Sequence, residues 1–398
     1  MKYVMIIIDG VSDDQIEELN NKTPLEVAFA PNIHYIATKG EIGRIETAYE
    51  GFPVESMVCI MGLLGYDPVK YYPSGRASFE AMAQGINIGE KDLAFRCNIV
   101  SVDNEEKRIT DFTAGLISDT NAKKFISKIK LPYNNWELYT GQSYRNTLIV
   151  RDAKLEASDI VCFPPHMHIG EEICTLNPHM KNKKENILIE ELWEFLLKSK
   201  SNNKMLWLWS PSKAITWPSF TEMTGLKGAV VCGMDFLRGI AMAADMDFDI
   251  IPGTTGYIDT DYKQKGIYAK KYLEDHDFVL VHINATDEEA HQHNFKGKIR
   301  AIEKIDNDII GPLMSELNTK YSDDFRIIIC GDHKTRCSDG KHIGDPVPFA
   351  MYGKDVRPTS EMGYSEKKCL NGRMYKGIDF ICSKLKNNCL KGELNYYE

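Results

Sequence analysis

The sequence lacks several features that would assign it to a class at once. No window reaches 18 consecutive apolar residues, so no transmembrane helix is predicted. The apolar run from Val4 to Ile8 is too short for a signal-peptide core, and no small-residue cleavage site follows it. Internal repeats and low-complexity tracts are missing too. We therefore expect a globular cytoplasmic protein without a membrane partner.

Basic residues are too few for a general polyanion binder. Lysine and arginine total 48 against 57 acidic residues, which gives a net charge of −9 and a pI of about 5.7. The basic clusters are short and interrupted by acids, as in residues 181–185. This composition argues against a nucleic-acid partner. A small anionic substrate fits, because a few arginine and lysine side chains in a cleft can bind one.

Paired cysteine motifs are also missing. The chain has ten cysteines but no Cys-x-x-Cys pair. In a chain of 398 residues without a signal peptide, scattered cysteines are expected to be reduced thiols. They stand at positions 59, 97, 162, 174, 232, 330, 337, 369, 382 and 389.

Short apolar runs alternate with helical patterns along the chain. Such an alternation is typical of an α/β fold with a mostly parallel sheet covered on both faces. The predicted strands are Val4–Ile8, Leu148–Val150, Leu206–Trp209, Phe278–Ile283 and Phe325–Cys330. The predicted helices are Ile189–Lys198, Asp235–Ala244, Tyr262–Glu274, Lys298–Leu317 and Lys376–Lys386.

Polar residues that could perform chemistry fall into two stretches, 9–80 and 227–345. The segment between them carries its own strands and helices. Ligands of open α/β sheets bind at the carboxyl ends of the strands. We therefore predict a core domain built from residues 1–95 and 223–398, with a smaller α/β domain inserted at 96–222.

Three segments place ligand-type residues at predicted strand ends. Asp9 follows the first strand, and Asp332-His333 follow the strand Phe325–Cys330, with His342 nine residues after His333. After the strand Phe278–Ile283, Asp287 and His291 are four apart, so one helical turn would put both on one face. Such a pair suits a divalent metal. Each segment alone could equally be a turn cap or a surface contact; together they favour a metal site, because buried charges need partners.

Ser56 stands at the start of an apolar, helix-compatible stretch that runs from Met57 to Leu64. A serine there is either a helix cap or a nucleophile. A helix N-terminus beside a dication favours an alkoxide and an incoming phosphate.

These residues lie in a series of short segments whose order and spacing resemble one known family. The chain resembles the cofactor-independent phosphoglycerate mutases of the archaeal type, within the alkaline phosphatase superfamily. The segments include Ile8-Asp9-Gly10, Lys22-Thr23-Pro24-Leu25-Glu26, Leu64-Gly65-Tyr66-Asp67-Pro68, Ala94-Phe95-Arg96-Cys97-Asn98, Gly225-Leu226-Lys227-Gly228-Ala229, Pro252-Gly253-Thr254-Thr255-Gly256-Tyr257, Lys298-Ile299-Arg300-Ala301-Ile302-Glu303 and Asp345-Pro346-Val347-Pro348-Phe349.

The resemblance implies an alkaline-phosphatase-like three-layer core with two divalent metal ions. One metal would be held by Asp287, His291 and His342, and the other by Asp9, Ser56, Asp332 and His333. A mixed imidazole and carboxylate ligand set suits Mn²⁺ or Zn²⁺ better than Mg²⁺, and Co²⁺ also fits. No 2,3-bisphosphoglycerate would be needed.

The resemblance also implies a reaction and its residues. A phosphoryl group would move between O3 and O2 of glycerate through a phosphoserine at Ser56, with Lys227 close to it. The substrate, a small phosphorylated hydroxy acid, would be bound by side chains that include Arg76, Arg96, Arg145 and His166. The family usually has glycine and aspartate around the nucleophile, and His or Asn four residues after it; this chain has Glu55, Met57 and Ile60 at those positions.

Two alternatives remain at the level of the sequence. The first is a metal-dependent phosphatase or phosphotransferase of the same superfamily that acts on another small phosphorylated metabolite. The second is a metal-binding homologue without catalysis. The sequence leaves the native metal and the oligomeric state open.

Overall fold

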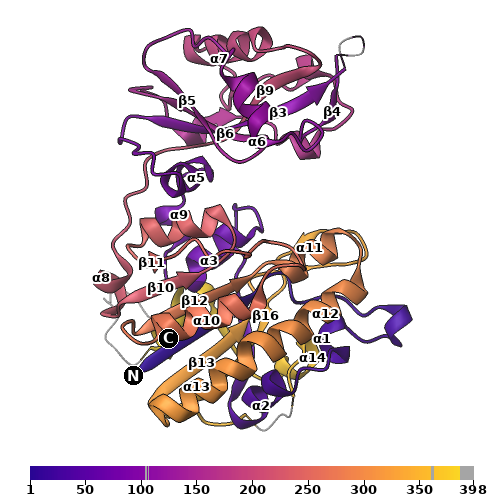
Figure 1. Ribbon diagram of the computed structural model, residues 1–398, viewed down its shortest axis with the longest axis vertical. Coiled ribbons are helices and arrows are strands. Elements are labelled where there is room, and N and C mark those ends of the chain that lie inside the picture. The colour runs from indigo at the N-terminus through magenta and orange to yellow at the C-terminus, as the bar shows by residue number, and fades with distance from the viewer. Residues whose placement is uncertain (104, 106, 360–362, 386–398) are drawn as a thin grey trace. The chain divides into compact units, whose positions relative to one another are not determined.

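The chain forms two compact units, each with its own sheet (Figure 1). The computed structural model describes residues 1–103, 105, 107–359 and 363–385. Unit 1 comprises Met1–Tyr71 and Trp217–Glu398, and unit 2 comprises Tyr72–Thr216.

Unit 2 begins and ends earlier in the sequence than the predicted range 96–222. The backbone N–H groups of Arg76 and Ser78 donate to Ser210 (3.0 Å) and Ser212 (2.7 Å). Residues 72–95 are therefore tied to the last strand of unit 2, and the predicted boundary at 95 is wrong. The polar stretch 9–80 extends past Tyr71, so the distribution of polar residues does not mark the boundary between the units.

Unit 1 contains an eight-stranded sheet with the order β11-β10-β12-β1-β13-β16-β2-β17. β16 runs antiparallel to both of its neighbours, and every other pair is parallel, so the prediction of a mostly parallel α/β sheet is confirmed. The strands are β1 (Lys2–Ile8), β2 (Glu41–Glu46), β10 (Gly228–Val231), β11 (Asp247–Phe248), β12 (Phe278–Ile283), β13 (Phe325–Cys330), β16 (Val347–Gly353) and β17 (Arg373–Lys376).

Helices cover both faces of this sheet, which gives three layers (Figure 1). Alternate residues of β1, such as Val4, Ile6 and Ile8, pack against one helical layer. A strand buried on both faces reads as a continuous apolar run, as the sequence of β1 does. One layer holds α1 (Pro24–Val27), α2 (Pro31–Lys39), α10 (Tyr262–Tyr272), α12 (Phe295–Ile305) and α13 (Gly311–Tyr321). The other holds α3 (Ser56–Leu63), α9 (Asp235–Ala243) and α15 (Gly377–Lys384).

The single helix predicted over Lys298–Leu317 is divided. A π-helical turn, Asp306–Ile310, separates α12 from α13. The Asp306 carboxylate accepts hydrogen bonds from the backbone N–H groups of Asn32 (3.2 Å) and Ile33 (2.7 Å) at the start of α2. The turn thus places a carboxylate at the positive end of a neighbouring helix.

Unit 2 contains a five-stranded sheet in which every pair is antiparallel. The predicted strands at 148–150 and 206–209 are present, but short apolar runs do not reveal strand direction. The strands are β3 (Leu93–Val102), β4 (Ile109–Asp111), β5 (Trp136–Thr140), β6 (Arg145–Val150) and β9 (Lys204–Ser212). The main helices are α5 (Ala77–Ala83), α6 (Asp119–Ile126) and α7 (Ile187–Lys198).

The nine cysteines within the described residues are unbridged, and Cys389 lies outside those residues. Over the same part of the chain, no helix combines the length and the apolar character needed to cross a bilayer.

Candidate active site

The site lies where three parallel strands of unit 1 end. Asp9 directly follows β1, and Asp332 and His333 follow β13. Asp287 and His291 are on α11 (Ala285–His291), which begins two residues after β12. Because β1 pairs with both β12 and β13 in parallel, the three carboxyl ends meet at one edge of the sheet.

The first group of potential metal ligands consists of Asp9, Asp332 and His333. Their ligand atoms all lie within 4.8 Å of one another. Nε2 of His333 is 3.5 Å from Oδ1 of Asp9 and 3.6 Å from Oδ2 of Asp332. All three side chains are fully buried. Two carboxylates and an imidazole in this arrangement fit a divalent cation.

The second group centres on Asp287. Its carboxylate oxygens lie 3.2 Å from Nε2 of His291 and 3.3 Å from Nε2 of His342. These two imidazole nitrogens are 3.0 Å apart, and the ring of His342 stacks on that of His333 at 3.9 Å. Asp287, His333 and His342 also satisfy the ligand spacing, so His333 lies within reach of both groups. The fold thus brings together the six nominated aspartates and histidines.

Ser56 is the first residue of α3, beside the first group. Its Oγ lies 3.2 and 3.3 Å from the two carboxylate oxygens of Asp9 and 3.1 Å from Nε2 of His333. The free N–H groups of the first helical turn make this a favourable place for a phosphate. Met57 and Ile60, which differ from the family pattern, are buried in the core.

The electrostatics of the site fit a cation. Burial, together with the charges of Asp332 and Asp287, raises the pKa of the Asp9 carboxyl well above its usual range. Burial alone would also raise the pKa of Asp287, but hydrogen bonds with His291 and His342 hold it well below that range. Oδ2 of Asp332 is buried and has no hydrogen-bond partner among the described residues. An unpaired buried carboxylate oxygen is costly, and a bound metal ion would satisfy it.

Two further side chains orient the site and were not predicted. His282, a fully buried residue of β12, places Nε2 3.1 Å from Oδ2 of Asp9. Thr335 donates to Oδ1 of Asp287 (2.6 Å), and its Oγ1 lies 3.1 Å from Nδ1 of His333. Side chains that contact metal ligands in this way fix their orientation. The sequence feature that could have indicated His282 is a histidine inside an otherwise apolar strand.

Gly10 allows the tight approach of these segments. Its φ of +60° favours glycine, and a Cβ atom there would lie 2.5 Å from Oγ1 of Thr335 and 2.8 Å from Oδ1 of Asp287. The Asp-Gly pair after β1 is therefore required by space as well as by backbone conformation.

Unit 2 contains the four side chains nominated for substrate binding, and three of them lie at one tryptophan, whereas the guanidinium of Arg145 lies 4.5 Å from the ring centroid of Tyr144. The guanidinium of Arg96 lies 3.9 Å from the ring centroid of Trp209, and that of Arg76 lies 5.5 Å from it. The ring of His166 packs edge-on against the same tryptophan at 5.4 Å. Burial, together with the charges of Arg76 and Arg96, lowers the pKa of His166 to about 4. Trp209 is thus the centre of a cluster of two arginines and an imidazole that is uncharged at neutral pH.

Arg96 is the most constrained member of this cluster. It is buried, its Nε donates to Glu80 (2.9 Å), and its Nη1 has no partner among the described residues. Burial lowers the pKa of Arg96 to about 10, and the nearby charges of Arg76 and Arg145 act in the same direction. A buried guanidinium nitrogen without a partner is suited to a carboxylate or phosphate oxygen.

Lys227 does not lie at this site. It directly precedes β10, and its carbonyl accepts hydrogen bonds from the N–H groups of Asp277 and Phe278 at the start of β12. Its Nζ lies 3.4 Å from Asp247. Because β10 and β12 are parallel to β1, Lys227 is at the opposite edge of the sheet from Asp9. The prediction that Lys227 lies close to the reacting group is therefore wrong.

The fold and the site together define a class: an α/β protein with a candidate two-metal centre and a serine at a helix N-terminus beside it. Comparisons with known proteins agree with this class and narrow it. The family model described as 2,3-bisphosphoglycerate-independent phosphoglycerate mutase matches residues 37–203. A protein of that name from Methanosarcina barkeri is 37% identical over 397 residues, covering 96% of this chain and 98% of the relative.

Other relatives and solved structures extend the match. A relative of the same name from Methanothermobacter thermautotrophicus is 35% identical and covers 92% of both chains. The cofactor-independent phosphoglycerate mutase of Thermoplasma acidophilum superposes with a TM-score of 0.65 at 28% identity, covering 97% of this chain and 99% of that one. The PH0037 protein of Pyrococcus horikoshii gives a TM-score of 0.77 at 27% identity over 96% of both chains. The chain belongs to the 2,3-bisphosphoglycerate-independent phosphoglycerate mutase family.

Proposed function

We propose that this protein interconverts 3-phosphoglycerate and 2-phosphoglycerate, with Ser56 as the phosphoryl acceptor. The observation that carries the proposal is the position of the Ser56 hydroxyl, within 3.3 Å of both Asp9 carboxylate oxygens at the first turn of α3. Family membership gives the substrate. The named relatives do not favour the alternatives of a phosphatase or a non-catalytic homologue.

Two divalent metal ions are proposed to complete the centre. Asp9, Ser56, Asp332 and His333 would hold one of them; Asp287, His291 and His342 would hold the other. The imidazole and carboxylate donors favour Mn²⁺ or Zn²⁺, with Co²⁺ and Mg²⁺ as further candidates. When bound, the metals would supply positive charge that stabilises the oxygens of an in-line displacement.

In the reaction we propose, one phosphoryl group is transferred from the substrate to Ser56 and then back to the same glycerate. The bond between phosphorus and O3 of glycerate breaks as a bond to Ser56 Oγ forms; the Ser56 hydroxyl gives up its proton, and O3 gains one. Glycerate then turns so that O2 attacks the phosphoserine, loses its proton and restores the Ser56 hydroxyl. Because Ser56 holds the group between the two steps, no 2,3-bisphosphoglycerate is needed. Water must be excluded during this interval, or phosphate would be released.

We propose that unit 2 binds the anionic groups of the substrate. Three of its nominated side chains, Arg76, Arg96 and Arg145, are cationic, and His166 is neutral at physiological pH. Nη1 of Arg96 is buried and has no hydrogen-bond partner within the described part of the chain. Arginine binds both carboxylate and phosphate in a bidentate manner. This assigns a substrate-covering role to unit 2 and the bond-breaking role to unit 1.

Purified protein incubated with 3-phosphoglycerate and Mn²⁺, without bisphosphoglycerate, tests the proposal. We expect 2-phosphoglycerate without free phosphate. Phosphate alone would indicate a phosphatase, and the absence of both products would reject the mutase function. Acid quench after labelled 3-phosphoglycerate, followed by peptide mapping, should place the label on Ser56. Ser56→Ala should abolish the labelling. Ser219→Ala is its matched control, because Ser219 also stands at a helix N-terminus of unit 1, as the cap of α8 (Phe220–Thr224).

A further inference from the structure

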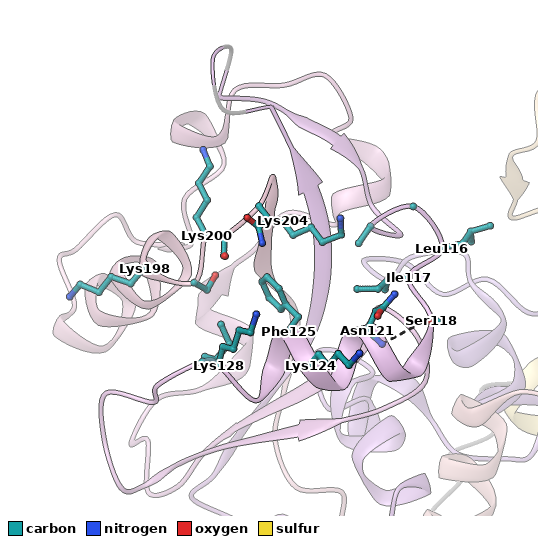
Figure 2. Close-up of a pocket in the computed structure, with 16 residues that line it drawn as sticks. Leu116, Ile117, Ser118, Asn121, Lys124, Phe125, Lys128, Lys198, Lys200 and Lys204 are labelled. Carbon is teal, nitrogen blue, oxygen red and sulfur yellow. Dashed lines mark hydrogen bonds between the residues drawn. The ribbon is translucent and has the colours of Figure 1, made fainter.

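Unit 2 contains a cavity that the proposed reaction does not use. Its volume is about 710 Å³, which is in the range of small-molecule sites. It is bounded by the loop 114–118, one side of α6, the C-terminal end of α7 and the turn that leads into β9 (Figure 2). None of the four nominated substrate-binding residues lines it.

The lining of this cavity is strongly cationic. Five of its sixteen lining residues are lysines and none is acidic, although the whole chain carries a net charge of −9. The lysines are Lys124, Lys128, Lys198, Lys200 and Lys204. In Figure 2, Lys124, Lys128 and Lys204 lie around Phe125, whereas Lys198 extends away from it. Such a concentration of one charge in an acidic protein needs an explanation beyond solubility.

Few carboxylates balance these lysines. Lys198 pairs with Glu194 at 2.8 Å, and within the described part of the chain it is the one lysine of the five with an ion pair. Burial would raise the pKa of Asp111, but hydrogen bonds from Thr113 and Gly115 and the charge of Lys204 lower it. The Asp111 carboxylate thus already accepts hydrogen bonds from Thr113 and Gly115 of its own loop.

The arrangement of the charges is unfavourable without a counter-ion. Lys124 lies in the last turn of α6, and Lys128 lies two residues beyond the end of that helix. Ser201 and Lys204 flank the two-residue turn Asn202-Asn203 and pair with each other, and Lys200 directly precedes this turn. Positive charges from separate segments therefore converge on one cavity, where an anion would relieve their repulsion.

We propose that this cavity binds a small polyphosphate, meaning a molecule with two or more linked phosphate groups. The spread of the lysines over three segments favours an extended anion over a single phosphate. Side chains of Ser118, Asn121, Ser201 and Asn202 line the same cavity and offer hydrogen bonds to phosphate oxygens. The half-buried ring of Phe125 provides an apolar wall for an organic end of the ligand.

Calorimetric titration of the full-length protein with pyrophosphate, and separately with ATP, at fixed ionic strength tests this inference. We expect saturable one-to-one binding of both. Lys124→Gln/Lys204→Gln should weaken it by about tenfold, because two of the five positive charges that line the cavity are removed. The matched control is Lys181→Gln/Lys184→Gln, which changes two exposed lysines of unit 2 outside the cavity and should leave binding unchanged.

A further variant separates the cavity from the candidate metal centre. Asp9→Asn/Asp332→Asn should retain pyrophosphate binding, since neither residue lines the cavity. Three results would overturn the inference: no saturable binding of pyrophosphate below about 1 mM, equal binding by the lysine variant, or loss of binding in the Asp9→Asn/Asp332→Asn variant. Adenosine binding as tightly as ATP would overturn it too, because the phosphates would then contribute nothing.

Discussion

Lys298 is predicted to stabilise the loops that carry the candidate metal ligands. It belongs to α12 and is fully buried. Its Nζ donates to the carbonyl of Ser12 (3.0 Å), to Oδ2 of Asp13 (2.9 Å) and to the carbonyl of Thr335 (2.7 Å). One ammonium group therefore joins the loop after β1 to the loop after β13. Replacement by methionine keeps most of the unbranched apolar stem and removes the ammonium group that makes all three hydrogen bonds.

The cost of Lys298→Met follows from these contacts. Breaking a buried ion pair by removing one partner costs about 3–5 kcal/mol, because the other charge is left buried. Asp13 keeps hydrogen bonds from the N–H groups of Asp14 and Cys337. The cost of losing the Lys298–Asp13 ion pair is therefore near the lower limit of this range. The two carbonyls add about 1 kcal/mol each. The sum, about 5 kcal/mol, is a large part of the stability of an ordinary domain.

Hydrogen exchange measured by mass spectrometry on peptides from β1, β12 and β13 reports the stability of unit 1 separately from that of unit 2. Lys296→Met is the matched control, because Lys296 is exposed on the same helix. Asp13→Asn combined with Lys298→Met should recover part of the loss, since the unpaired charge is then absent. A decrease of less than about 1 kcal/mol in the free energy of unfolding of unit 1 in Lys298→Met would refute the reasoning, because removing one partner of a buried ion pair costs more than this.

Three further predictions concern the site. Ser56→Ala should lower mutase turnover by roughly 10³-fold or more in steady-state assays, because the acceptor is lost, while calorimetry still detects metal binding; full activity would reject the role of Ser56. His282→Gln should weaken metal affinity by about 10–100-fold, measured by metal titration, because Asp9 loses its buried partner; unchanged affinity would contradict this. Arg96→Lys should raise the KM for 3-phosphoglycerate by about tenfold, because the planar fork is lost; an unchanged KM would assign Arg96 a purely structural role.

Much of unit 1 could be predicted because its polar residues follow its strands. Asp9, Asp287 and Asp332 each come after a buried apolar run, and parallel strands bring such positions to one edge. His342 does not follow a strand directly; it was nominated because it comes nine residues after His333, and the family resemblance implied the metal it would bind. The histidines and aspartates do lie together; which metal they bind stays a prediction.

The errors have equally physical causes. Lys227 precedes its strand instead of following it, so a rule based on strand ends would have excluded it. The boundary at 95 was wrong because Arg76 and Ser78 are held by strand β9, more than 130 residues later in the chain. Contacts between residues so distant in the sequence leave no local pattern. The role of His282 depends in the same way on a partner in another strand.

The charges of the two clusters suggest why both are needed for an anionic substrate. The centre in unit 1 contains three buried carboxylates, Asp9, Asp287 and Asp332, and these alone would repel a phosphate. The cluster in unit 2 is cationic and can attract the substrate but contains no nucleophile among the residues nominated for it. Phosphate can therefore approach Ser56 only after cations have neutralised the carboxylates. Under the proposed function, we therefore expect metal binding to precede productive substrate binding in unit 1, whereas the arginines of unit 2 are charged at every physiological pH.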